Sequence, residues 1–133
     1  MLQSIHHIAI ICSDYKQSKD FYCRILGLEI IAEVYREERQ SYKLDLALNG
    51  QYCIELFSFP DAPKRPSYPE AQGLRHLAFG VNNLPKEIER LAASGGVPPL
   101  GDLRRTSSHR AGWLSKSVVK SNAARGQANG IGS

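Results

Sequence analysis

Apolar positions in the first sixty residues follow the spacing of one helix flanked by strands. Residues 5–12 form an isoleucine-rich run, which predicts a buried strand. Ser13 and Asp14 can cap a following helix, whose apolar residues keep a helical spacing until Gly27 ends it. Three more strands are predicted, and Asn49-Gly50 between the last two is a strong hairpin signal. These strands cover residues 28–35, 42–48 and 52–59, so the predicted unit is βαβββ.

The same order of elements begins again after a proline-rich segment. Residues 60–73 contain prolines at positions 60, 63, 66 and 69, too many for a central strand or a helix interior. This segment is therefore predicted to be a linker. Residues 74–81 then predict a strand, and Asn83 is placed to cap a helix that Gly95-Gly96 closes.

The repeat has a fixed offset of 69 residues, at which His7 aligns with His76, Asp14 with Asn83 and Gly27 with Gly96. The same succession of strand, helix cap, helix and terminating glycine therefore occurs twice. A repeated module of this kind predicts an α+β fold with two similar halves, each of which needs a partner surface for its apolar face.

The second module stops after Gly96, where three more strands would be expected. Residues 97–133 are rich in Gly, Ser, Arg and Lys, with short apolar stretches only at 111–114 and 118–119. We therefore expect a domain at 1–96, followed by a basic irregular or disordered tail at 97–133. The domain comprises module one at 1–59, a linker at 60–73 and the start of module two at 74–96. The abrupt change also resembles translation in a wrong reading frame.

The net charge of +4 comes from this tail. Residues 1–96 hold 11 basic and 12 acidic side chains, whereas residues 97–133 hold 6 and 1. No basic stripe with interleaved aromatics runs through the domain, which argues against nucleic-acid binding. No stretch approaches the ~18 apolar residues of a spanning helix. The three cysteines form no CxxC pair and argue against a disulfide framework. We expect a cytoplasmic protein with no membrane and no nucleic-acid partner.

Three polar side chains interrupt predicted apolar faces, and alternation makes each of them the lone polar residue on its face. They are His7, Glu55 and His76. A carboxylate at such a position is costly unless it is paired, protonated or bound to a metal. Two imidazoles and a carboxylate suit one divalent ion such as Zn, Ni, Mn or Fe. Any one of the three could instead be a core polar residue with a hydrogen-bond partner. The equivalence of His7 and His76 in the repeat favours ligands.

Four segments together resemble the vicinal oxygen chelate superfamily and, within it, small bacterial glyoxalase I-like proteins. They are HIAII at 7–11, FYCRILGL at 21–28, IELF at 54–57 and LRHLAF at 74–79. The resemblance implies paired βαβββ modules that form a cupped mixed sheet, with the second module incomplete in this chain. It also implies that His7, Glu55 and His76 hold the metal.

The resemblance implies the isomerisation of a methylglyoxal–glutathione adduct through an enediolate, with Glu55 as metal ligand and proton carrier. The fourth ligand of the family, a glutamate of the last strand, has no counterpart after Glu89, and its absence argues against full activity. The positions that contact glutathione in glyoxalase I are Ile11 and Phe59 here. An apolar pair favours a different small-molecule substrate, such as an α-oxo compound.

Further expectations concern the substrate, the partners and the alternative functions. Lys43, Arg65 and Arg75 could receive an anionic substrate group, although each is also a common kind of surface charge. His6 is expected to face away from His7, and His109 lies in the patternless tail, so neither joins the site.

A homodimer is expected, because family members commonly pair. A metal-free or inactive small-molecule-binding module remains an alternative, as does a thiol transferase or dioxygenase of the same superfamily.

Overall fold

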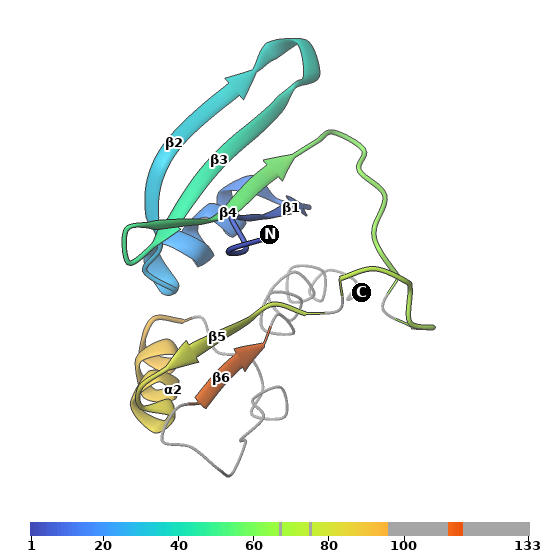
Figure 1. Cartoon of the computed structure of the whole chain (residues 1–133). Coiled ribbons are helices and arrows are strands. Elements are labelled where there is room, and N and C mark those ends of the chain that lie inside the picture. Colours follow the sequence, from blue (N-terminus) through green and yellow to red (C-terminus); the bar gives the residue numbers. More distant parts are fainter. Residues whose placement is uncertain (67, 75, 96–111, 116–133) are drawn as a thin grey trace, which may run out of the picture. The chain divides into compact units, whose positions relative to one another are not determined.

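A computed structural model of the chain describes residues 1–66, 68–74, 76–95 and 112–115 (Figure 1). The chain divides into two compact units, Met1–Pro69 and Glu70–Ser133. The division falls inside the predicted linker at 60–73.

The first unit contains one helical segment and a curved, mixed four-stranded sheet in the order β1-β4-β3-β2 (Figure 1). Strand β1 runs parallel to β4, and the other neighbouring pairs are antiparallel. This is the predicted βαβββ order. Its elements are β1 (Ile8–Cys12), α1 (Tyr15–Asp20), a π-helical turn (Phe21–Ile25), β2 (Glu29–Arg36), a 3-10 turn (Glu37–Arg39), β3 (Ser41–Leu48) and β4 (Gln51–Ser58).

Local signals in the sequence set the ends of these elements. The Asp14 carboxylate accepts a hydrogen bond from the Gln17 backbone N–H at 2.9 Å and so caps α1. Gly27 ends the helical segment with a φ of 81°, in the left-handed region that favours glycine. Asn49 and Gly50 both have positive φ and join β3 to β4 in a tight hairpin. The predicted cap, stop and hairpin turn are confirmed.

The core of the first unit lies on one face of β3 and β4. Leu44 pairs with Leu56 and Leu46 pairs with Ile54 across the two strands, and all four are almost fully buried. The helical segment adds the buried Phe21, Tyr22 and Ile25. Because side chains alternate along a strand, the intervening residues of β3 and β4 project from the opposite face. That second face carries Lys43, Asp45, Glu55 and Phe57.

The second unit repeats the start of the first. It comprises β5 (Ala78–Val81), α2 (Leu84–Ala93) and β6 (Gly112–Ser115). The Asn83 side chain accepts a hydrogen bond from the Lys86 backbone N–H at 3.1 Å, which reproduces the Asp14 cap 69 residues later. The repeat found in the sequence is thus visible in the hydrogen bonding of the two helix caps.

Strand β6 corrects the prediction for the tail at one place. Gly112–Ser115 pairs antiparallel with β5, from Ala78 opposite Ser115 to Val81 opposite Gly112. This stretch overlaps the short apolar run at 111–114, whose aromatic and aliphatic residues suit a strand. The rest of the predicted tail at 97–133 lies outside the described residues. In the part of the chain that the structure describes, no helix has the length and apolar character needed to span a membrane.

Candidate metal centre

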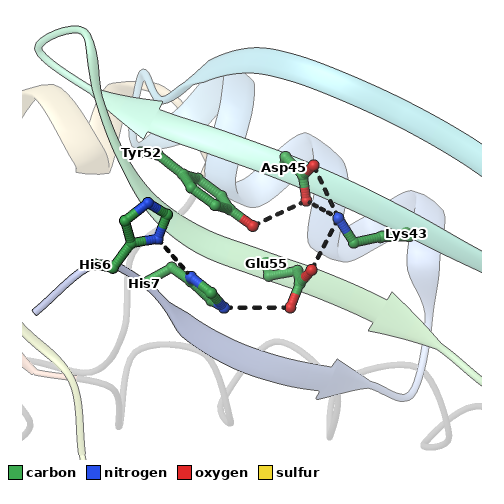
Figure 2. A network of polar contacts seen from close by, with 6 residues as sticks. All are labelled: His6, His7, Lys43, Asp45, Tyr52 and Glu55. Atoms are coloured by element: carbon green, nitrogen blue, oxygen red, sulfur yellow. Dashed lines mark hydrogen bonds and ion pairs between the residues drawn. The ribbon is translucent and has the colours of Figure 1, made fainter.

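The sheet brings His7 and Glu55 together, although they lie far apart in the sequence. His7 immediately precedes β1, and the parallel β1–β4 register places Ala9 opposite Glu55. Nε2 of His7 lies 3.5 Å from Oε2 of Glu55 (Figure 2). Two of the three predicted ligands are therefore neighbours on one face of the first unit.

Glu55 is not alone on this face. Its other oxygen, Oε1, lies 2.8 Å from Nζ of Lys43. The same ammonium group donates to both carboxylate oxygens of Asp45, at 2.8 and 2.9 Å. The expectation that Glu55 is the lone polar residue on an apolar face is wrong, because Lys43 and Asp45 reach that face from β3. A partly buried carboxylate, 16% exposed, thereby gains the partner that its position requires.

Hydrogen bonding and burial keep the donors of this cluster protonated. The hydrogen bond to Asp45, followed by that to Glu55, raises the pKa of Lys43 above its ordinary value. The Tyr52 hydroxyl donates to Asp45 at 3.1 Å. Partial burial, assisted by this bond, raises the pKa of Tyr52 to about 12. At neutral pH the cluster therefore presents a cationic lysine and a neutral tyrosine to the two carboxylates.

His6 belongs to the same cluster, contrary to expectation. The two Nδ1 atoms of His6 and His7 lie 2.8 Å apart, and His6 meets the Tyr52 ring edge-on. His7 stacks on the same ring at 5.0 Å. Strand β1 begins only at Ile8, so strict alternation does not extend back to the two histidines. With its Nδ1 engaged by His6, His7 presents Nε2 to Glu55.

The His7–Glu55 pair fits a metal ion by distance. An ion about 2.1 Å from each of two atoms separated by 3.5 Å would make an angle of roughly 110° between them, the tetrahedral value. Within each unit, the described residues contain no group of three His, Cys, Asp or Glu side chains that could hold a metal. His76 belongs to the second unit, where it is exposed and lies two residues before β5. The set of three ligands therefore stays a prediction.

The predicted substrate-binding residues have different surroundings. Lys43 is held between two carboxylates, and Arg65 is exposed in the segment that follows β4. Arg75 and His109 lie outside the described residues. Sequence reasoning missed His6, Asp45 and Tyr52 as members of the cluster. Only the pairing of β3 with β4 places Asp45 opposite Glu55.

Comparison with known proteins identifies the family. Residues 4–111 match the Glyoxalase/Bleomycin resistance protein/Dioxygenase superfamily. The chain belongs to this superfamily. The match extends past Gly96, where the predicted domain ends. The superfamily assignment agrees with the resemblance in the four sequence segments.

The chain is similar to several known proteins. The uncharacterised protein YwkD of Bacillus subtilis is 64% identical over 95 residues, which cover 71% of this chain and 74% of that protein. The crystal structure of a glyoxalase family protein from Enterococcus faecalis is similar at 43% identity, with a TM-score of 0.68 over 79% of this chain and 81% of that one. Leishmania major glyoxalase I shares the fold at 14% identity, with a TM-score of 0.54 over 92% of this chain and 93% of the enzyme.

Proposed function

We propose that the chain is a metal-dependent, glyoxalase I-like lyase or isomerase that acts on a small α-oxo compound or its thiol adduct. One divalent ion, Zn, Ni, Mn or Fe, would be held by His7, Glu55 and His76. The observation that carries the proposal is the spacing of 3.5 Å between the His7 imidazole and the Glu55 carboxylate. A bound ion would supply stabilisation for the negative charge of an enediolate.

The residues around Glu55 suit the proposed chemistry. Lys43 engages Oε1 of Glu55, while Oε2 faces His7, so the two oxygens have separate partners. Such an arrangement favours a carboxylate that binds an ion through one oxygen and is oriented through the other. Glu55 is also the proposed proton carrier, since moving a proton next to a carbonyl group is a task suited to a positioned carboxylate.

A second candidate function is a metal-free or inactive small-molecule-binding module. The observation that favours it is the ion pair between Lys43 and Glu55, because it balances the Glu55 charge without any metal. The two candidates differ in one measurable property, the metal content of the purified protein.

The deciding experiment measures bound metal by mass spectrometry in the full-length chain, in His76→Ala and in the control variant His109→Ala. We expect about one ion per chain in the wild type and the control, and less than about a tenth of that in His76→Ala. Full metal content in His76→Ala would contradict the ligand set. Absence of metal from the wild type after growth and refolding with Zn, Ni, Mn or Fe would favour the binding module.

The activity assay uses methylglyoxal with and without glutathione. We expect weak or absent turnover of the glutathione adduct, because the positions that contact glutathione in glyoxalase I are the apolar Ile11 and Phe59 here. Turnover at the level of an established glyoxalase I would overturn this substrate assignment while leaving the metal site intact.

We also propose a homodimer as the working form. In the described part of the first sheet, β2 pairs with β3 alone and forms an edge that exposes Ile30, Ile31 and Val34. Exposed apolar edge strands are common sites of association. Sedimentation velocity of the wild type and of Ile31→Lys tests the idea, and a monomeric wild type at micromolar concentration would contradict it.

A further inference from the structure

Two arginines lie over two phenylalanines at the end of the sheet face that carries Glu55. The guanidinium carbon of Arg36 lies 5.6 Å from the centre of the Phe57 ring, and that of Arg39 lies 4.9 Å from the Phe59 ring. The two rings are themselves stacked, with centres 5.8 Å apart. We call these four residues the arginine–phenylalanine patch.

The patch adjoins the candidate metal centre. Phe57 follows Glu55 by two positions in β4 and pairs with Lys43 across the β3–β4 ladder. Residues two apart in a strand share a face and are separated by roughly 7 Å. A small molecule of a few carbon atoms would therefore span the distance from Glu55 to the patch.

The guanidinium groups of the patch have unused hydrogen-bond donors. Within the described residues, neither Arg36 nor Arg39 forms an ion pair or a hydrogen bond through its side chain. Glu37 and Glu38 share the connecting turn, yet neither carboxylate pairs with these arginines in that part of the structure. A guanidinium group offers five donors in a planar fork that matches the two oxygens of a carboxylate or a phosphate.

A buried hydroxyl beside the patch supplies an independent observation. Ser41 is fully buried, and its Oγ has no hydrogen-bond partner among the residues that the structure describes. The β2–β3 register places Ser41 directly opposite Arg36. A buried hydroxyl without a hydrogen-bond partner is destabilising, so its presence at this position calls for a ligand oxygen.

We propose that Arg36, Arg39 and Ser41 form a binding site for the acid group of a small molecule, either a carboxylate or a phosphate. The guanidinium groups move from the rings toward the ligand, and the Ser41 hydroxyl gains a ligand oxygen as its acceptor. This inference rests on the proposed function only where it names the substrate class. With the oxo group at Glu55 and the acid group at the patch, the substrate is a short oxo acid or an oxo phosphate.

Anion binding to the full-length, metal-free chain tests the site without relying on the metal. Calorimetric titrations use inorganic phosphate in one arm and acetate in the other, so that the preferred acid group is identified. The site variant is Arg36→Gln/Arg39→Gln. The control variant, Lys16→Gln/Lys86→Gln, removes the same charge from exposed lysines of the two helices.

We expect saturable binding of at least one anion by the wild type, a loss of about tenfold or more in the site variant, and a change below about twofold in the control. Equal losses of anion affinity in the two double variants would show that the anion is attracted only by the net charge of the protein. That result would overturn the proposal. Absence of saturable binding in both wild-type arms would also overturn it. Metal content is measured separately, so failure of the metal site and failure of the anion site remain distinguishable.

Ser41→Ala provides a second variant whose folding is not at risk. Removing an unpartnered buried hydroxyl should leave the melting temperature equal or slightly higher. Anion binding should nevertheless weaken by about threefold, because one donor to the ligand is lost. Unchanged anion affinity in Ser41→Ala would remove the hydroxyl from the proposed site, and unchanged affinity in the arginine variant would end the proposal.

Discussion

The ammonium group of Lys43 lies 2.8 Å from Oε1 of Glu55, the carboxylate oxygen that does not face His7. Each oxygen of the Glu55 carboxylate therefore has its own partner, Lys43 at Oε1 and His7 at Oε2. Lys43 also couples Glu55 to Asp45, because the same ammonium group holds both carboxylates. The candidate metal centre is therefore one charged cluster, and its members should respond together to substitution.

Lys43→Met should destabilise the metal-free protein and should increase the stabilisation that the protein gains from bound metal. Without the ammonium group, Asp45 and Glu55 face each other across β3 and β4 as two unscreened carboxylates. We expect a loss of about 1–3 kcal/mol in the free energy of unfolding, measured by urea denaturation with EDTA present. Saturating metal should restore more stability to this variant than to the wild type. Lys64→Met, at an exposed position, is the control, and an equal effect of both substitutions would contradict the coupling.

His6→Ala should weaken metal binding although His6 is not a proposed ligand. The contact of 2.8 Å between the Nδ1 atoms of the two histidines fixes the orientation of the His7 ring. Partners of this kind typically change metal affinity by 10–100-fold, and we expect roughly tenfold here. His6→Asn keeps a hydrogen-bonding group near the same place and should recover most of the affinity. Competition with a chromogenic chelator measures both variants, and an unchanged affinity in His6→Ala would show that the contact does not orient His7.

Asp14→Ala should lower the free energy of unfolding by about 1 kcal/mol, because the Gln17 N–H loses its capping acceptor. Asp14→Asn retains an acceptor oxygen and should cost much less. Asn83→Ala tests the equivalent cap at the Lys86 N–H and should have a similar effect on the unfolding of the second unit. Denaturation followed by circular dichroism gives these values. A cost below about 0.3 kcal/mol for Asp14→Ala would argue against the cap as a source of stability.

Ionisation of the buried Tyr22 hydroxyl should lower the stability of the protein as the pH rises above 10. Burial raises its pKa from 10.0 to about 12, so the folded state holds the phenolic proton more tightly than the unfolded state does. The resulting stability is complete below pH 10 and is lost as the pH rises toward 12. Tyr22→Phe should be nearly as stable at pH 8 and should lose less stability between pH 10 and 12. Parallel falls of the unfolding free energy in the two proteins would contradict this assignment.

Sequence patterns located most elements but not all of their ends. The strands predicted from residues 5 and 74 begin at Ile8 and Ala78, because an apolar run does not reveal where a partner strand stops pairing. The caps at Asp14 and Asn83 depend on contacts three residues away, and both were predictable. Lys43 was predicted to meet an anionic substrate group, and its two carboxylate partners became visible only through the pairing of strands.

The sequence alone determined the repeat, the helix caps and the hairpin turn at Asn49-Gly50. These features depend on local spacing along the chain. The tertiary structure decided that His7 lies beside Glu55, because the two residues meet only through the pairing of β1 with β4, and it decided what else surrounds Glu55. A bulge at Cys53 shifts the β3–β4 register, so that Tyr52 pairs with Ala47 while Glu55 pairs with Asp45. An uninterrupted two-residue hairpin would set Glu55 opposite Leu44, because one extra residue moves every later side chain to a new partner.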